Sequence, residues 1–161
     1  MQPADLPAVM AIQAACYGME LLEPEAVLRA RLERADDTCW VAERGGQVCA
    51  YLAAYRSELG AVTPLHAVFR PAPVPDTLYL HDLAVDPAHH GKGVGQRLVD
   101  ALLLKAAREG LAWSALVAVR GAAAFWERLG FAAHPAVATE QSDSLSSYGQ
   151  AACYMARPLA G

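Results

Sequence analysis

The sequence has 161 residues, a length that suits one globular domain with a sizeable buried core. Apolar residues make up 55% of it and the formal net charge is -4, so it lacks the basic surplus typical of nucleic-acid-binding proteins. No apolar run is long enough to cross a bilayer, we expect no signal peptide, and four scattered cysteines without a C-x-x-C pair favour reduced thiols in a cytoplasmic protein.

The first half of the sequence predicts two helices, a hairpin and a loop. Apolar residues recur at helical spacing in residues 4–17 and 24–35. Residues 38–57 then change to a strand pattern, and Gly45-Gly46 marks a tight turn between two strands. Residues 58–77 hold four prolines and show no clear period, so we expect a long surface loop there.

The second half alternates strands and helices. Its predicted elements are a nearly apolar central strand at 78–85, a helix at 93–110, a strand at 112–119, a helix at 121–130, and strands at 131–139 and 151–159 around a polar loop at 140–150. Composition does not change along the chain. This order therefore predicts one α/β domain with a mixed sheet over residues 1–161.

A glycine-rich turn joins the central strand to the long helix, with the sequence His90-Gly91-Lys92-Gly93-Val94-Gly95. The first amides of a helix have no intrahelical partner and lie at the positive end of its dipole. Glycine lets the backbone approach a ligand closely and adopt positive φ. Basic side chains at His89, His90, Lys92 and Arg97 lie nearby. The segment therefore predicts a cradle for a phosphate or pyrophosphate.

The spacing of these glycines disfavours two familiar phosphate sites. A Walker A loop needs Ser or Thr after Gly-Lys, where this sequence has Gly93. A dinucleotide fingerprint starting at Gly91 needs a third glycine where this sequence has Gln96. ATP and NAD are therefore weaker candidates for the ligand.

The turn resembles the pyrophosphate-binding signature of the GNAT superfamily of N-acetyltransferases, Gln/Arg-x-x-Gly-x-Gly/Ala. Gly93 and Gly95 match it, and His90 replaces Gln or Arg at the first position. The stretches "LHDLAVDP" and "FWERLGF" resemble the family's fourth strand and its late helix-to-strand step. The resemblance implies a mostly antiparallel central sheet, splayed at the fourth and fifth strands and flanked by about four helices. The family's usual opening strand has little room in "MQP".

The resemblance further implies acetyl-coenzyme A as the donor substrate. Its pyrophosphate would lie on the amides of Gly91 to Gly95, and its pantetheine arm would bond the backbone of Leu83 and Val85. A backbone N–H would polarise the thioester carbonyl. The coenzyme-binding residues expected in this way are Leu83, Ala84, Val85, His90, Gly91, Lys92, Gly93, Val94, Gly95, Gln96, Phe125 and Trp126.

Acyl transfer to an amine needs a group that takes the amine's proton. Strand alternation places Tyr79, His81, Leu83 and Val85 on one face and Asp82 on the other. His81 is the candidate general base because the pKa of an imidazole lies near neutrality. Tyr79 is expected to line the acceptor pocket, and Asp82 to bind substrate or to anchor a neighbouring strand.

The acid that protonates the leaving thiolate is less obvious. The resemblance places a tyrosine on the late helix, but this sequence has Trp126 there, and an indole does not act as the acid. Trp126 is more simply a packing residue. The acid is therefore absent, unnecessary or supplied from another position, and Tyr148, between the last two strands, is the candidate for that other position.

Other polar and aromatic residues give weaker signals. Glu23 and Glu25 flank a proline at a helix start and fit the helix dipole better than acid–base chemistry. The histidines lack a recognised ligand spacing, so no metal is expected. Aromatic residues that could form a pocket wall are Tyr17, Trp40, Tyr55 and Phe69.

Together these features predict an N-acetyltransferase that moves acetyl from acetyl-coenzyme A to a primary amine of a small molecule or peptide. Direct attack would be assisted by a general base near His81. No nucleic acid, membrane or metal is expected, and a homodimer is compatible with the resemblance. The alternative is a catalytically silent acyl-coenzyme-A-binding module, because the late helix lacks its tyrosine.

Overall fold

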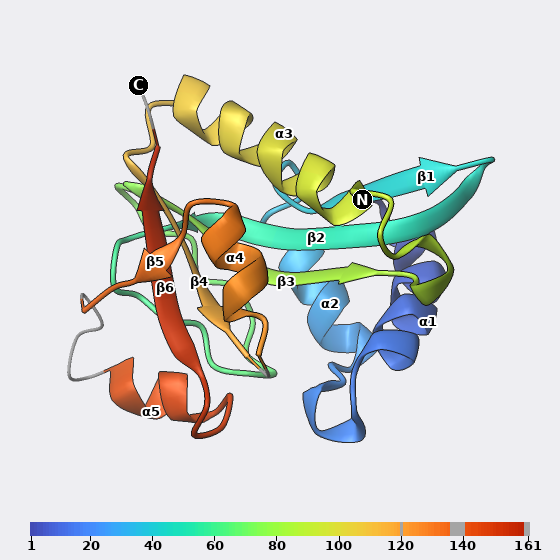
Figure 1. Ribbon diagram of the computed structural model, residues 1–161, viewed down its shortest axis with the longest axis horizontal. Coiled ribbons are helices and arrows are strands. Elements are labelled where there is room, and N and C mark those ends of the chain that lie inside the picture. The colour runs from blue at the N-terminus through green and yellow to red at the C-terminus, as the bar shows by residue number, and fades with distance from the viewer. Residues whose placement is uncertain (120, 136–140, 160–161) are drawn as a thin grey trace.

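The computed structural model describes residues 1–119, 121–135 and 141–159, which form a six-stranded sheet with helices on both faces (Figure 1). The strands are β1 (Trp40–Arg44), β2 (Gln47–Ser57), β3 (Thr77–Val85), β4 (Trp113–Ala118), β5 (Ala132–Ala133) and β6 (Cys153–Pro158). The helices are α1 (Leu6–Cys16), α2 (Glu25–Leu32), α3 (Val94–Arg108), α4 (Ala123–Arg128) and α5 (Ser142–Ser146). The strand order is β1-β2-β3-β4-β6-β5.

Helices α3 and α4 cover one face of the sheet, and α1 and α2 cover the other (Figure 1). The apolar stripe of α3 includes Leu98 and Leu102 at helical spacing, and it packs on Leu80 of β3 and Leu116 of β4. On the opposite face, α1 packs against Tyr51 and Ala84. The predicted mixed α/β architecture is confirmed.

Strands β3 and β4 form the one parallel pair of the described sheet. They are paired from Thr77 to Leu80 and from Trp113 to Leu116, and no pairing is found beyond these residues. Strand β3 continues to Val85 and β4 to Ala118, where β4 is still paired with β6 but no longer with β3, so β3 and β4 separate. The predicted splay is therefore present. It falls at the third and fourth strands of this chain rather than the fourth and fifth. The strand numbers are one lower because the segment ahead of α1, Pro3–Asp5, forms a 3-10 turn where the family has its opening strand.

A β-bulge interrupts β3 at His81. Asp82 pairs with Ala53 of β2 and Leu80 pairs with the next residue, Ala54, so His81 has no counterpart. One extra residue reverses the alternation of side chains beyond it. The expectation that Asp82 lies on the face opposite His81 is therefore wrong, because Asp82 lies on the α1 side of the sheet, where it contacts Tyr51.

The bulge also moves the residues that follow it. Leu83 and Val85 lie beside Gly95 on the α3 side of the sheet, whereas His81 contacts Glu23 on the α2 side. The expectation that they share a face with His81 is wrong for the same reason. Both faces of the end of β3 thus carry residues expected at the site.

The C-terminal part departs further from the predicted elements. The segment expected as a polar loop at 140–150 contains α5. Of the strand expected at 131–139, residues 131–135 are described and contain the two-residue strand β5, and residues 136–140 lie outside the described residues. Residues 58–76 are irregular, as predicted for nearly all of the loop at 58–77, but Val62 and Phe69 are buried rather than on the surface. All four thiols are free. Within the described ranges, no helix combines the length and apolar character that crossing a bilayer requires.

Candidate functional site

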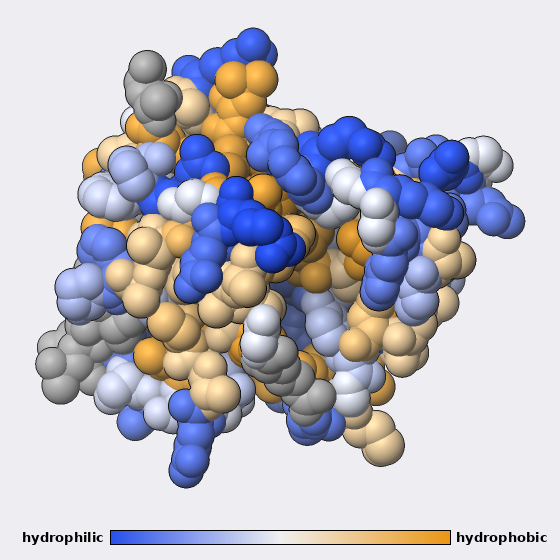
Figure 2. Space-filling model, in the orientation of Figure 1, coloured by the Kyte–Doolittle hydropathy of each residue, from blue (hydrophilic) through white to orange (hydrophobic). Residues whose placement is uncertain are grey.

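A cavity of about 730 Å³ opens where β3 and β4 separate. The N-terminus of α3 borders it at one end, and the connection between α1 and α2 borders it at the other. Figure 2 shows this face of the molecule hollowed near its centre, with apolar side chains inside the recess and polar ones around it. An elongated ligand with an anionic end and an apolar body suits such a cavity.

The anionic end of the cavity is built from backbone. Gly91 and Gly93 have φ of 72° and 69°, in the left-handed region that side chains disfavour, and Gly93 is the N-cap of α3. A Cβ added to Gly95 would lie 3.2 Å from Cγ2 of Val85, so only glycine fits against β3 without a shift. The first turn of α3 has no acidic side chain. Its free amides and its dipole therefore favour an anion.

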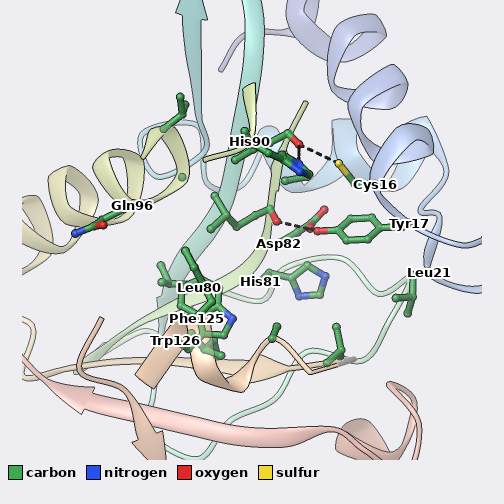
Figure 3. Close-up of a pocket in the computed structure, with 18 of the residues that line it drawn as sticks. Cys16, Tyr17, Leu21, Leu80, His81, Asp82, His90, Gln96, Phe125 and Trp126 are labelled. Carbon is green, nitrogen blue, oxygen red and sulfur yellow. Dashed lines mark hydrogen bonds between the residues drawn. The ribbon is translucent and has the colours of Figure 1, made fainter. Parts of the chain in front are cut away.

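Most of the residues expected to bind the coenzyme line the cavity. They are Leu83, Ala84, Val85, His90, Gly91, Gly93, Val94, Gly95, Gln96, Phe125 and Trp126. Lys92 does not line it, because its Nζ turns away to donate a hydrogen bond to the carbonyl of Ala88 at 2.8 Å. The side chain of Gln96 points away from His81 and Asp82 (Figure 3).

The carbonyl of Val85, one of the two expected pantetheine contacts, is already engaged in this structure. Nε2 of His90 lies 2.8 Å from it, and the thiol of Cys16 donates to it at 3.1 Å (Figure 3). The other carbonyl, of Leu83, lies 2.8 Å from the hydroxyl of Tyr17, whose one proton is shared with Oδ1 of Asp82 at 2.6 Å. Both carbonyls therefore point toward the α1 border of the cavity, where a ligand would compete with or join these donors.

Helix α4 supplies an aromatic wall. The rings of Phe125 and Trp126 lie 4.9 Å apart, and Trp126 also packs edge-on against Phe131 at 5.5 Å. Trp126 is buried, which fits the packing role expected of it. This wall faces the end of β3 across the cavity (Figure 3).

Asp82 lines the cavity but is held by tyrosines. Its carboxylate accepts a hydrogen bond from the hydroxyl of Tyr17 at 2.6 Å (Figure 3). The hydroxyl of Tyr51 donates to its other oxygen at 2.5 Å. Burial raises the pKa of this carboxyl. Of the four aromatic residues considered for a pocket wall, Tyr17 lines the cavity, and Trp40, Tyr55 and Phe69 do not.

Tyr79 does not line the cavity, so the expectation that it meets the acceptor is wrong. Its ring is buried and packs against Tyr55, with ring centroids 5.5 Å apart. The reason is its position: β3 is still paired with β4 at this residue, and the strands separate only after Leu80.

His81 and Tyr148, the two expected catalytic residues, lie next to each other. Nδ1 of His81 is 3.3 Å from the hydroxyl of Tyr148, which also donates a hydrogen bond to the carbonyl of Thr63 at 2.6 Å. The His81 side chain is only 1% exposed. Burial lowers the pKa of its imidazole, so His81 is neutral near pH 7 and able to accept a proton.

Glu23 is the residue that the sequence interpretation misjudged most. Its carboxylate is 2% exposed and forms a two-pronged ion pair with the guanidinium of Arg31, and Oε2 lies 3.4 Å from Nε2 of His81. Burial opposes its ionisation, but the contacts with His81 and Arg31 outweigh burial and lower its pKa to about 2. The spacing of Glu23 and Arg31 is not the i,i+3 or i,i+4 spacing that marks an ion pair on a helix, and the contact with His81 joins residues far apart in the sequence.

Histidine, cysteine, aspartate and glutamate side chains of the described residues form no group of three that could hold a metal ion. The donors at the cavity suit an anion at α3 and a proton transfer at His81. The groups that line the cavity include backbone amides, the hydroxyls of Tyr17 and Tyr148, and the imidazoles of His81, His89 and His90.

A family model described as "Acetyltransferase (GNAT) family" matches residues 6–131. No curated protein sequence matches the chain. Among solved structures, a GphF GNAT-like decarboxylase in complex with isobutyryl-CoA is 20% identical with a TM-score of 0.78, covering 99% of this chain and 97% of that one.

Two further solved structures share the fold. The ribosomal-protein-S18-alanine N-acetyltransferase from Escherichia coli is 20% identical with a TM-score of 0.69, covering 100% of this chain and 92% of that one. The PaiA N-acetyltransferase from Thermoplasma acidophilum, in complex with coenzyme A, is 12% identical with a TM-score of 0.68, covering 98% of this chain and 95% of that one.

Proposed function

The chain belongs to the acetyltransferase (GNAT) family, and we propose that it transfers an acyl group, acetyl in the simplest case, from coenzyme A to a primary amine of a small molecule or peptide. The observation that carries this proposal is the cavity at the split between β3 and β4, which ends at the glycine-capped N-terminus of α3 and contains a neutral histidine in its wall.

The coenzyme's pyrophosphate is assigned to the amides of Gly91 to Gly95. Left-handed glycines and the unpaired amides of α3 supply donors and positive potential there. The pantetheine arm is assigned to the apolar trough along Leu83, Val85 and the α4 wall. This assignment supports a coenzyme A thioester over ATP or NAD, whose fingerprints the sequence lacks.

The reacting carbonyl is assigned to the bulge in β3. His81 has no partner on β2, because a bulged residue leaves the regular ladder of hydrogen bonds, and His81 is also one of the residues that line the cavity. A backbone N–H in that position polarises the thioester carbonyl and stabilises the negative charge that develops on its oxygen.

The acceptor amine is assigned to the opposite end of the cavity, between the α1–α2 connection and Tyr148. Leu21 and Leu65 line this end together with His81. The amine attacks the thioester carbon, the C–N bond forms, the C–S bond breaks, and the amine loses a proton to His81 with Tyr148 beside it. Thioesters with acyl chains longer than acetyl are also candidate donors, since the structure of the GphF GNAT-like decarboxylase contains isobutyryl-CoA.

Calorimetric titration with acetyl-CoA, ATP and NAD tests the donor site. We expect acetyl-CoA alone to bind. Release of free thiol is then followed with a panel of amines and N-terminal peptides, with His81→Gln as the inactive control. If acetyl-CoA binds but no amine causes release of free coenzyme A thiol, the result would favour the silent coenzyme-binding module. If acetyl-CoA does not bind at all, the proposal would be overturned.

A further inference from the structure

A buried line of charged and polar groups runs from α2 to the cavity wall, through Arg31, Glu23, His81 and Tyr148. Each member touches the next: Arg31 binds the Glu23 carboxylate, Glu23 lies 3.4 Å from Nε2 of His81, and Nδ1 of His81 lies 3.3 Å from the Tyr148 hydroxyl. The four residues come from different segments of the chain. Burying charged and polar groups costs free energy unless each of them has a hydrogen-bond or ion-pair partner, so the contacts along this line indicate what each residue does.

Glu23 is held from several directions. The side-chain amide of Gln13 clamps its backbone, donating to its carbonyl at 2.9 Å and accepting from its N–H at 2.8 Å. Arg31 binds both carboxylate oxygens, and the backbone N–H of His66 donates to Oε1 at 2.9 Å. Arg31 itself is anchored by the carbonyl of Ala67. The carboxylate is therefore fixed in place and kept ionised.

This carboxylate borders the cavity, but its oxygens are already engaged. Arg31 binds both of them, and the N–H of His66 donates to Oε1. Glu23 therefore acts through a neighbour, and the neighbour that also borders the cavity is His81.

A neutral imidazole carries its proton on one nitrogen, and the hydrogen bonds around the ring decide which one. A carboxylate beside Nε2 favours the N–H form at that nitrogen, because two lone pairs facing each other would repel. Nδ1 is then left with its lone pair directed at the Tyr148 hydroxyl. That hydroxyl has two acceptors within reach, the Thr63 carbonyl at 2.6 Å and Nδ1 at 3.3 Å.

Resting on the proposed function, we infer that Glu23 is a positioning residue that fixes the proton of His81 on Nε2, so that Nδ1 receives the amine's proton by way of Tyr148. As the C–N bond forms, the amine gives a proton to Oη of Tyr148 while the proton of that hydroxyl passes to Nδ1. As the C–S bond breaks, the thiolate takes the proton of Oη and Nδ1 returns its own. The site ends as it began, and the proton has moved from amine to thiol.

The charges around His81 set the expected pH response. The titratable groups that face it are Glu23 from the α1–α2 connection, Arg31 from α2, Asp82 and Tyr79 from β3, and Tyr148 from the segment after α5. Phe69 completes the surroundings with its ring 5.4 Å away. Burial and Arg31 disfavour the imidazolium, and Glu23 and Asp82 favour it. Removing the Glu23 charge alone should therefore lower the pH at which the imidazole titrates.

The first test needs no activity. The protein is labelled with ¹⁵N in its histidine rings, and the His81 signals are assigned by their loss in His81→Gln. We expect the wild-type ring of His81 to be protonated at Nε2 and bare at Nδ1. A ring protonated mainly at Nδ1 would overturn the inference, whether or not an amine substrate has been found.

The second test removes the ion pair without leaving a lone buried charge, in the double variant Glu23→Leu/Arg31→Met. Replacing both partners by apolar residues often preserves the fold. The matched control is Glu25→Leu/Arg29→Met, which removes the exposed ion pair of the same helix. We expect the buried variant to lose its preference for the Nε2 proton and to lose kcat at least about tenfold.

In the same variant, KM for the acyl-CoA should stay within about twofold, because the inferred role belongs to the chemical step. The control should match wild type in both readouts. An unchanged tautomer or an unchanged kcat in the folded buried variant would contradict the inference. Glu23→Gln should in addition shift the acid limb of kcat to lower pH, a response that a purely structural role would not give.

Discussion

The two ends of the cavity are built in different ways. The glycine wall, Gly91–Gly95, consists of consecutive residues that present backbone amides at the start of α3. The charged wall consists of Glu23, Arg31, His81 and Tyr148, which come from four separate segments and meet through side chains. The glycine wall contains no buried charge. The charged wall depends on a buried ion pair.

Because the two walls are built differently, they should respond differently to substitution. A backbone site survives changes in nearby side chains but fails when a Cβ is added at a constrained glycine. A buried charge network fails when one partner is lost, because the other remains desolvated and unpaired. Damage to the glycine wall should thus weaken donor binding, and damage to the charged wall should weaken folding or the proton transfer.

The largest expected effect is on stability, from Glu23→Ala. This substitution leaves Arg31 buried without its carboxylate, so the free energy of unfolding should fall by about 3–5 kcal/mol. Urea unfolding followed by circular dichroism measures it. Glu25→Ala, which removes the exposed partner of Arg29, should change it by less than about 0.5 kcal/mol. Equal losses in the two variants would show that burial does not distinguish the pairs.

The same carboxylate should make the fold sensitive to acid. The pKa of Glu23 is about 2 in the folded protein against an ordinary 4.5, so its contribution is complete above pH 4.5 and is lost as the pH falls toward 2. The loss amounts to up to about 3 kcal/mol. Urea midpoints measured from pH 6 to pH 3 should fall more steeply in wild type than in Glu23→Leu/Arg31→Met. If the urea midpoints of wild type and of the double variant depended on pH in the same way, the lowered pKa of Glu23 would be contradicted.

The glycine wall should respond in binding. Gly93→Val places a β-branched residue at φ 69°, which costs about 1–2 kcal/mol and distorts the start of α3. The affinity for acetyl-CoA should fall roughly tenfold. Gly110→Val is the matched control, because that glycine has φ 84° at the other end of the same helix. Titration calorimetry should show normal affinity in the control, and a similar loss in both variants would implicate general destabilisation.

The smallest effect is expected outside both walls. Arg56 bridges Asp37 and Glu109 at 2.6 Å and 2.8 Å, but all three side chains are partly exposed. Arg56→Ala should therefore lower the free energy of unfolding by less than about 1 kcal/mol, and less still in high salt. Thermal unfolding at two salt concentrations checks this. A loss comparable to that of Glu23→Ala would remove the contrast between buried and exposed pairs.

The glycine wall was predictable because its determinants are local. The strand, the glycine turn and the helix are adjacent in sequence, so the motif around Gly93 and Gly95 indicates both the geometry and the ligand class. The order of helices and strands up to α4 was predictable for the same reason, since hydrophobic periods mark them, whereas α5 lies in a segment that was expected to be a polar loop.

The charged wall was only half predictable. The residue types of His81 and Tyr148 indicated proton transfer, but nothing in the sequence marks the bulge that reverses the side chains after His81. Glu23 was misread because its proximity to a helix start offered a sufficient local explanation. Its contact with His81 joins residues that are far apart in the sequence, which is a tertiary property.

The most direct test of the central claim is a crystal structure of the protein with acetyl-CoA bound. The account predicts the pyrophosphate on the amides of Gly91 to Gly95, the pantetheine between β3 and β4, and the thioester carbonyl beside the bulge at His81. A coenzyme bound elsewhere, or with its thioester remote from His81, would contradict it.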